Sequence, residues 1–165
     1  MHRQVRQLSA TRALPWVIAL AFVGCERKAD SAPPGLQVAQ SKGDEFAVSA
    51  SVEGTIRPGS EAALVARVEA RKGFHINAEY PVNFRPQNNT DGVKFEKERY
   101  PLHESAERIP CGKGSEHACE LRATVPFTAL SPGEQRVAGI LAFSVCTEEK
   151  CLIEKAPIEV LLSVR

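Results

Sequence analysis

The stretch that decides the fold is Phe143-Ser144-Val145-Cys146-Thr147-Glu148-Glu149-Lys150-Cys151-Leu152-Ile153. Two apolar runs are joined by a polar loop of four residues, and a cysteine stands at each end of that loop. This pattern predicts a β-hairpin, in which the two residues that flank the loop face each other. Paired strand residues have Cα atoms about 4.5–5.5 Å apart, which is within the range that a disulfide accepts. We therefore expect a disulfide between Cys146 and Cys151.

The rest of the chain from residue 44 repeats an alternation of apolar and polar side chains with a period of two, which is typical of strands. The alternating apolar positions include Phe46, Val48, Ala50, Val52, Ala62, Leu64, Ala66, Val68, Ala70, Leu121, Ala123, Val125, Phe127, Ile158, Val160, Leu162 and Val164. The pattern lapses between residues 99 and 119, and no segment keeps helical spacing for three turns. About eight short strands separated by turns predict an all-β domain over residues 44–165, an antiparallel immunoglobulin-like β-sandwich.

Residues 1–24 have the features of a secretory signal. A basic start with three Arg and no acidic residue is followed by an apolar run over residues 13–23, which is too short to span a bilayer. Gly24 before Cys25 resembles the lipobox of bacterial lipoproteins, although Phe22 stands where that family usually has Leu. The resemblance implies that Cys25 carries the lipid and anchors the chain to a membrane, facing the periplasm or the cell surface. The alternative is an ordinary cleaved signal that leaves Cys25 as an unpaired thiol.

Residues 25–43 are charged and then rich in Ser, Ala, Pro and Gly, which predicts a flexible tether. The full chain has 21 Lys and Arg and 20 Asp and Glu. Loss of the three Arg in residues 1–24 would leave 18 basic and 20 acidic residues, a net charge of −2. A nearly neutral chain without a basic block gives no reason to expect nucleic-acid binding.

Export would place the cysteines in an oxidising compartment, where they pair. Four cysteines besides Cys25 allow three connectivities, and the short spacings favour 111–119 and 146–151. The bond between Cys111 and Cys119 would pin a loop with little apolar pattern, so we expect it to be structural. Alternatives are a redox role, or a zinc ion held by Cys111, His117 and Cys119, which lacks a fourth ligand. We expect no metal ion and no other cofactor.

The second bond, between Cys146 and Cys151, is a candidate redox-active disulfide. Closing so short a loop stabilises the fold by only about 2 kcal/mol, and less if the hairpin already closes it. The polar loop would hold the bond near solvent, where disulfides are labile. Glu148 and Glu149 oppose this, because anionic neighbours disfavour a thiolate. The alternative interpretation is an inert staple.

The segment Cys146-Thr147-Glu148-Glu149-Lys150-Cys151-Leu152, after an apolar strand and before a last strand over residues 158–164, resembles the N-terminal periplasmic domain of the DsbD thiol:disulfide interchange protein. That family implies an immunoglobulin-like sandwich that takes electrons from a membrane relay and passes them to periplasmic proteins. By this resemblance Cys146 and Cys151 are the exchanging, catalytic pair, and the partners are thioredoxin-like proteins or a membrane reductase.

The sequence departs from that family in several ways. Leu152 and Ile153 stand where Pro residues often follow the second cysteine, and the pair formed by Cys111 and Cys119 is additional. The chain has no transmembrane relay or thioredoxin-like domain, so the electron donor would be another protein. The family shields its cysteines with an aromatic and acidic cap loop, for which Glu79 and Tyr80 are the nearest candidates.

Other residues give weaker signals. His75 has no potential metal-binding partner nearby in sequence, so we interpret it as a strand residue hydrogen-bonded to backbone. No catalytic triad, phosphate-binding loop or carboxylate pair supports a hydrolase or a nucleotide enzyme. The alternative function is a non-catalytic sandwich that binds a protein or an envelope component, with both disulfides structural.

Overall fold

A computed structural model describes residues 41–87 and 92–165, and the described residues form strands without a helix. Eleven strands follow in chain order: β1 (Ser41–Lys42), β2 (Phe46–Val52), β3 (Glu61–Ala70), β4 (His75–Ile76), β5 (Asn83–Pro86), β6 (Val93–Lys94), β7 (Tyr100–Pro101), β8 (Glu107–Pro110), β9 (Ala118–Ala129), β10 (Gly133–Cys146) and β11 (Cys151–Val164). All pairings between these strands are antiparallel. Within the described ranges, no helix is long and apolar enough to cross a membrane.

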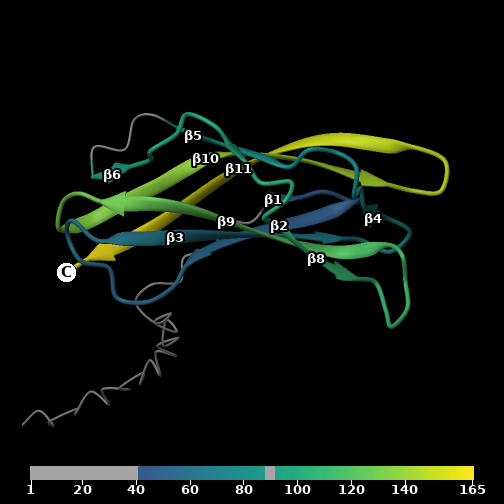
Figure 1. Ribbon diagram of the computed structural model, residues 1–165, viewed down its shortest axis with the longest axis horizontal. Helices are drawn as coiled ribbons and strands as arrows, with labels where there is room; N and C mark the ends of the chain where they lie inside the picture. Colours follow the sequence, from purple (N-terminus) through teal and green to yellow (C-terminus); the bar gives the residue numbers. More distant parts are fainter. Residues whose placement is uncertain (1–40, 88–91) are drawn as a thin grey trace, which may run out of the picture. The chain divides into compact units, whose positions relative to one another are not determined.

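The strands form two layers (Figure 1). In one layer β1, β2, β3 and β9 pair in that order, and β8 pairs with the first half of β9. In the other layer β11 pairs with β10, β10 with β5, and β5 with β7. The short strand β4 pairs with both β9 and β10, so it joins the two layers at one end. The predicted antiparallel sandwich is therefore confirmed.

The core lies between the layers and is filled by alternate side chains. In β2, and in β11 from Ala156 onward, every second residue is buried, because successive strand residues point to opposite faces. Phe46 of β2 meets Phe143 of β10 edge to face, with ring centroids 5.0 Å apart. The largest fully buried side chains are Phe84, Phe143, Leu64, Ile76, Leu121, Leu141 and Ile158. Burial of these apolar groups is the dominant stabilising contribution to the fold.

The long strands follow the alternation seen in the sequence, and most differences concern short ones. The last strand, expected over residues 158–164, runs without a break from Cys151 as β11. The structure has eleven strands where about eight were expected, because β7 and β8 lie in the segment without a clear pattern. The sheet also starts at Ser41, three residues before the expected domain boundary. The predicted signal of residues 1–24, the lipid-bearing Cys25 and most of the tether over residues 25–43 lie outside the described residues.

Candidate functional site

The β10–β11 hairpin ends in the expected disulfide. Both strands are 14 residues long, and Cys146 and Cys151 form the last pair before the turn. Their Cα atoms are 4.0 Å apart and their sulfurs are bonded. Thr147 shapes the turn: its N–H donates to the Lys150 carbonyl at 2.8 Å, and its Oγ1 accepts from the N–H groups of Glu149 and Lys150 at 3.2 Å each. The turn would therefore hold its form without the disulfide.

The two cysteines differ in exposure. Cys146 is only 4% exposed, whereas its partner Cys151 on the neighbouring strand is exposed. Ile153, two residues further on the same face of β11, is 63% exposed. The Cys151 side of the bond is therefore the more accessible one to an incoming thiol, and the exposed apolar side chain of Ile153 lies next to it.

A third side chain belongs to the same row. Cys146 pairs with Cys151 on one side and with His75 of β4 on the other. Directly opposed residues of antiparallel strands share a face of the sheet. His75, Cys146 and Cys151 therefore stand in line across three strands, which places an imidazole beside the disulfide.

Asn77 connects the segment between β4 and β5 to this row. Its Nδ2 donates to the Cys151 sulfur at 3.6 Å, and its backbone N–H donates to the carbonyl of Ser144 at 2.9 Å. Its Oδ1 accepts from the N–H groups of Glu79 and Tyr80, at 2.8 and 3.2 Å. One side chain thus folds the segment and places it against the disulfide. No pattern in the sequence singles out Asn77, because only strand pairing brings it to the hairpin.

The candidate cap residues lie in this same segment. Tyr80 lines a groove with Ala142 and Lys155, which share the disulfide's face of the β10–β11 hairpin. Glu79 is exposed. The hydrogen bond to a cysteine sulfur is made by Asn77, so a capping role for Glu79 and Tyr80 remains a prediction.

Ser144 is a buried polar residue on the same face. It is 1% exposed, and its Oγ has no hydrogen-bond partner among the described residues. It lies two residues before Cys146, so its side chain points to the same side of β10. An unpaired buried hydroxyl lowers the unfolding free energy by about 1–3 kcal/mol, so the fold is locally destabilised beside the disulfide.

The second disulfide, between Cys111 and Cys119, closes the loop that links β8 to β9. The N–H of Cys111 donates to the His117 carbonyl at 2.9 Å inside this loop. His117 stacks on His75, with ring centroids 4.0 Å apart, and its Nε2 lies 3.9 Å from Oε1 of Glu148. The loop, β4 and the β10–β11 turn therefore meet at one end of the sandwich, as Figure 1 shows.

These contacts bear on two interpretations of the sequence. The zinc alternative built on Cys111, His117 and Cys119 fails, because the two sulfurs are bonded to each other. His75 is the strand residue that the sequence predicts. The fold also brings it to His117 and Glu148, which are distant in sequence, and ligand atoms of the three lie within 4.8 Å of one another. Spacing along the chain gave no signal for this cluster, because strand pairing creates it.

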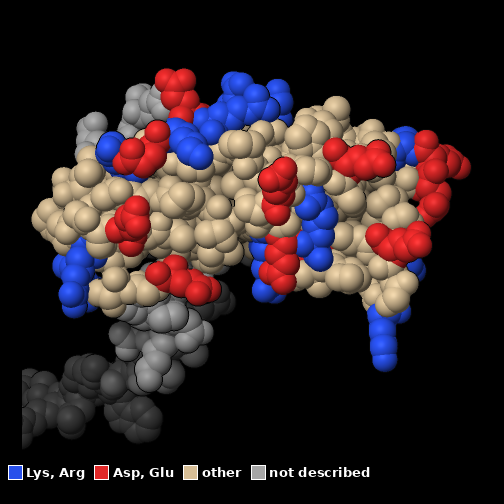
Figure 2. Space-filling model, in the orientation of Figure 1, with Lys and Arg blue, Asp and Glu red and all other residues tan. Residues whose placement is uncertain are grey.

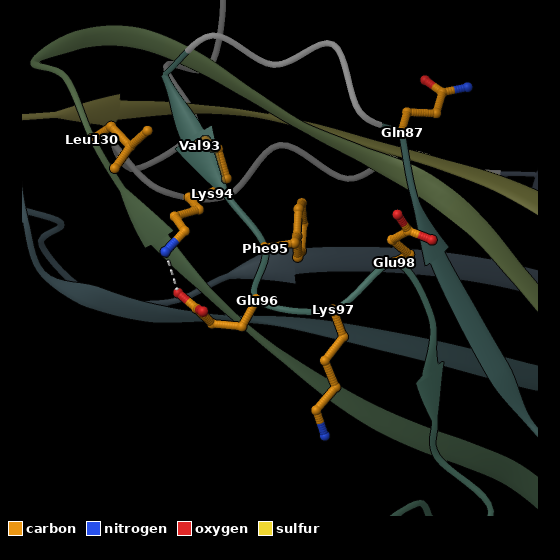
Figure 3. Close-up of a pocket in the computed structure, with 8 residues that line it drawn as sticks. All are labelled: Gln87, Val93, Lys94, Phe95, Glu96, Lys97, Glu98 and Leu130. Atoms are coloured by element: carbon orange, nitrogen blue, oxygen red, sulfur yellow. Dashed lines mark ion pairs between the residues drawn. The ribbon is translucent and has the colours of Figure 1, made fainter.

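The surface around the hairpin is acidic, whereas one pocket lies far from it. Acidic side chains gather at the end of the sandwich that carries the β10–β11 turn (Figure 2). A pocket of about 310 Å³ lies around β6 (Figure 3). There the Lys94 ammonium donates to Oε1 of Glu96 at 2.8 Å, and this hydrogen bond raises the pKa of Lys94. β6 pairs with the end of β9 near the start of β10, and a strand of β10's length spans roughly 40 Å. That pocket is therefore remote from the disulfide.

Comparisons with known proteins give little for this chain. No protein-family model matches it, and no curated protein matches it. Among solved structures, it is similar to AggA, the major subunit of aggregative adherence fimbriae type I from Escherichia coli. The identity is 13% and the TM-score 0.37, with 79% of this chain and 100% of that chain covered.

Proposed function

We propose that the chain is an exported, lipid-anchored envelope domain that relays thiol–disulfide exchange through Cys146 and Cys151, as the DsbD N-terminal domain does. The observation that carries this proposal is the asymmetry of the hairpin disulfide. Cys151 is open to solvent beside the exposed Ile153, and Cys146 is buried. Its partners are thioredoxin-like proteins or a membrane reductase that supply or accept electrons.

The asymmetry assigns roles to the two sulfurs. The thiolate of a reduced partner attacks the Cys151 sulfur, which forms a mixed disulfide and breaks the bond to Cys146. The Cys146 sulfur leaves with the electron pair as a thiolate and takes up a proton from water. The second thiolate of the same partner then attacks the partner sulfur that is bonded to Cys151. A disulfide forms within the partner, and Cys151 is released as a thiolate. The partner becomes a disulfide, and the domain holds two thiols for the next acceptor.

The turn and the Asn77 segment support this chemistry in different ways. Thr147 keeps the turn closed by hydrogen bonds, so the hairpin does not depend on the disulfide for its form. Asn77 holds its segment against Cys151, where it restricts approach to the bond from that side. Exchange therefore favours a partner that fits the open side near Ile153 over a small thiol that approaches at random.

The first test is the reduction potential of each disulfide. The chain with Cys25 replaced by Ser is equilibrated in thiol buffers, alkylated and mapped by mass. We expect the bond between Cys146 and Cys151 to be reduced at about −200 mV. The bond between Cys111 and Cys119 should stay closed down to about −300 mV. If both resist to the lower value, the redox proposal fails.

The second candidate is a non-catalytic binding module with two structural disulfides. It is favoured by β11, which in the described sheet pairs with β10 and otherwise forms a single bridge, from Val164 to Ile56. An edge strand with exposed Ile153 and Leu161 can accept a strand of another chain. Two resistant disulfides would turn the search to proteins that pair with this edge.

A further inference from the structure

Three potential metal ligands meet beside the hairpin disulfide, and they come from three separate segments. His75 lies in β4, His117 lies in the loop closed by the bond between Cys111 and Cys119, and Glu148 lies in the β10–β11 turn. One ligand atom of each lies within 4.8 Å of the other two. Figure 1 places all three segments at the same end of the sandwich.

The interactions among these side chains do not explain why they converge. The closest approach of His117 to Glu148 is 3.9 Å, which is beyond hydrogen-bond range, and these side chains are 51% and 87% exposed. An exposed ion pair of that kind contributes between about 0 and 1 kcal/mol. A cation bound by the two imidazoles and the carboxylate would give the convergence of these three side chains a stabilising interaction.

We propose that His75, His117 and Glu148 form a binding site for a divalent transition-metal ion of the Zn²⁺ and Cu²⁺ class. Two imidazoles and a carboxylate are a donor set that these ions prefer, and Mg²⁺ and Ca²⁺ prefer oxygen ligands. Three protein ligands leave a coordination position for water. The site is independent of the redox proposal, because its ligands are present whether or not the disulfide exchanges.

The backbone of the site is held in place, and the side chains have room to adjust. Ligand atoms around tetrahedral Zn²⁺ lie about 3.3 Å apart, so the present spacing must shorten by about 1.5 Å at its widest. His75 is fixed in the ladder beside Cys146, and the hydrogen bond between the Cys111 N–H and the His117 carbonyl positions the loop. The exposed Glu148 can supply the remaining movement by rotation.

The proposal gives the second disulfide a more specific task. The bond between Cys111 and Cys119 closes a loop of sequence separation 8, and His117 lies two residues before its end. The disulfide thus holds an imidazole against β4. A bound ion would connect this loop to the β10–β11 turn, next to the exposed Cys151.

Calorimetric titration with ZnCl₂ tests the site in the chain with both disulfides closed and Cys25 replaced by Ser, which removes the free thiol. We expect one ion per chain. His75→Ala and His117→Ala should each weaken binding at least tenfold, and Glu148→Gln several-fold. The matched controls Glu149→Gln and His103→Ala should leave the affinity unchanged. Mg²⁺ in excess should not compete.

Spectroscopy of the Cu²⁺ form gives a second readout. Electron paramagnetic resonance should show hyperfine coupling to two imidazole nitrogens in the parent chain and to one in His117→Ala. Because the His117 side chain is exposed, we expect this variant to keep its fold. The proposal is overturned if the triple variant of His75, His117 and Glu148 binds Zn²⁺ as tightly as the parent chain, or if the parent binds none.

Discussion

At the scale of single residues, the difference in exposure between Cys146 and Cys151 is the feature with the clearest consequence. Cys146→Ala leaves a thiol on the exposed edge strand, and Cys151→Ala leaves one that is 4% exposed when bonded. Reactivity follows access to the thiolate. We therefore expect the remaining thiol of Cys146→Ala to react with dithiobis(nitrobenzoate) at least ten times faster than the remaining thiol of Cys151→Ala. Equal rates in the two folded variants would contradict the assigned roles of the sulfurs.

Asn77 allows the sulfur contact to be separated from the turn that it organises. Asn77→Ala removes both, whereas Asn77→Asp keeps the Oδ1 that accepts from Glu79 and Tyr80 and loses the donor to Cys151. We expect Asn77→Ala to lower the unfolding free energy by about 1–2 kcal/mol and to speed reduction of the hairpin disulfide by dithiothreitol. Asn77→Asp should retain most of the stability. If neither variant changes the reduction rate, the segment does not shield the bond.

The sequence predicted the two cysteine pairs but none of the contacts around them. A pair flanking a short loop is a local pattern, so Cys146 and Cys151 could be assigned from spacing alone. Asn77, His75 and His117 reach the hairpin only because β4 pairs with both β9 and β10. The sequence predicts a short strand at His75, but a two-residue strand carries no pattern that shows which strands it pairs with.

At the scale of elements, the two disulfides should differ in what they contribute. The chain-entropy model gives the loop between Cys111 and Cys119 about 2–3 kcal/mol. The loop between Cys146 and Cys151 is already closed by strand pairing and by Thr147, so its bond should contribute less. We expect urea unfolding of the two double-Ala variants to show the larger loss for Cys111 and Cys119. The reverse order would make the hairpin disulfide the structural one.

Gly139 in β10 is required by the close approach of β5. A Cβ there would lie 2.6 Å from the carbonyl oxygen of Arg85 and closer still to the ring of Phe84. Gly139→Ala should therefore lower the unfolding free energy by about 1–3 kcal/mol. Gly112→Ala is the matched control, since nothing lies within 4 Å of its added Cβ. Equal melting temperatures for the two variants would contradict this packing.

The elements that the sequence did not predict share a physical cause. β7 and β8 contain Pro101 and Pro110, and β8 pairs with β9 through a register shift next to Pro110. Short edge strands of this kind bury few side chains, so they show no alternation. The long strands bury one face over most of their length, and that burial produces the period of two.

At the scale of the whole molecule, stability should come from the space between the layers rather than from the edges. Leu64→Ala removes a fully buried side chain of β3, and Leu161→Ala truncates one that is 42% exposed on β11. We expect losses in unfolding free energy of about 2–5 kcal/mol for the first and within about 0.5 kcal/mol for the second. Urea denaturation measures both. A large loss in Leu161→Ala would mean that this edge is covered in solution.

Both disulfides join cysteines that are neighbours along the chain, with sequence separations of 8 and 5. Short loops close fastest and at the lowest entropic cost, so each bond can form within its own hairpin before distant strands meet. Oxidative maturation should therefore reach the native connectivity directly, with no need for an isomerase to correct crossed bonds. If the chain is exported as proposed, it would be ready for thiol exchange as soon as its last hairpin has formed.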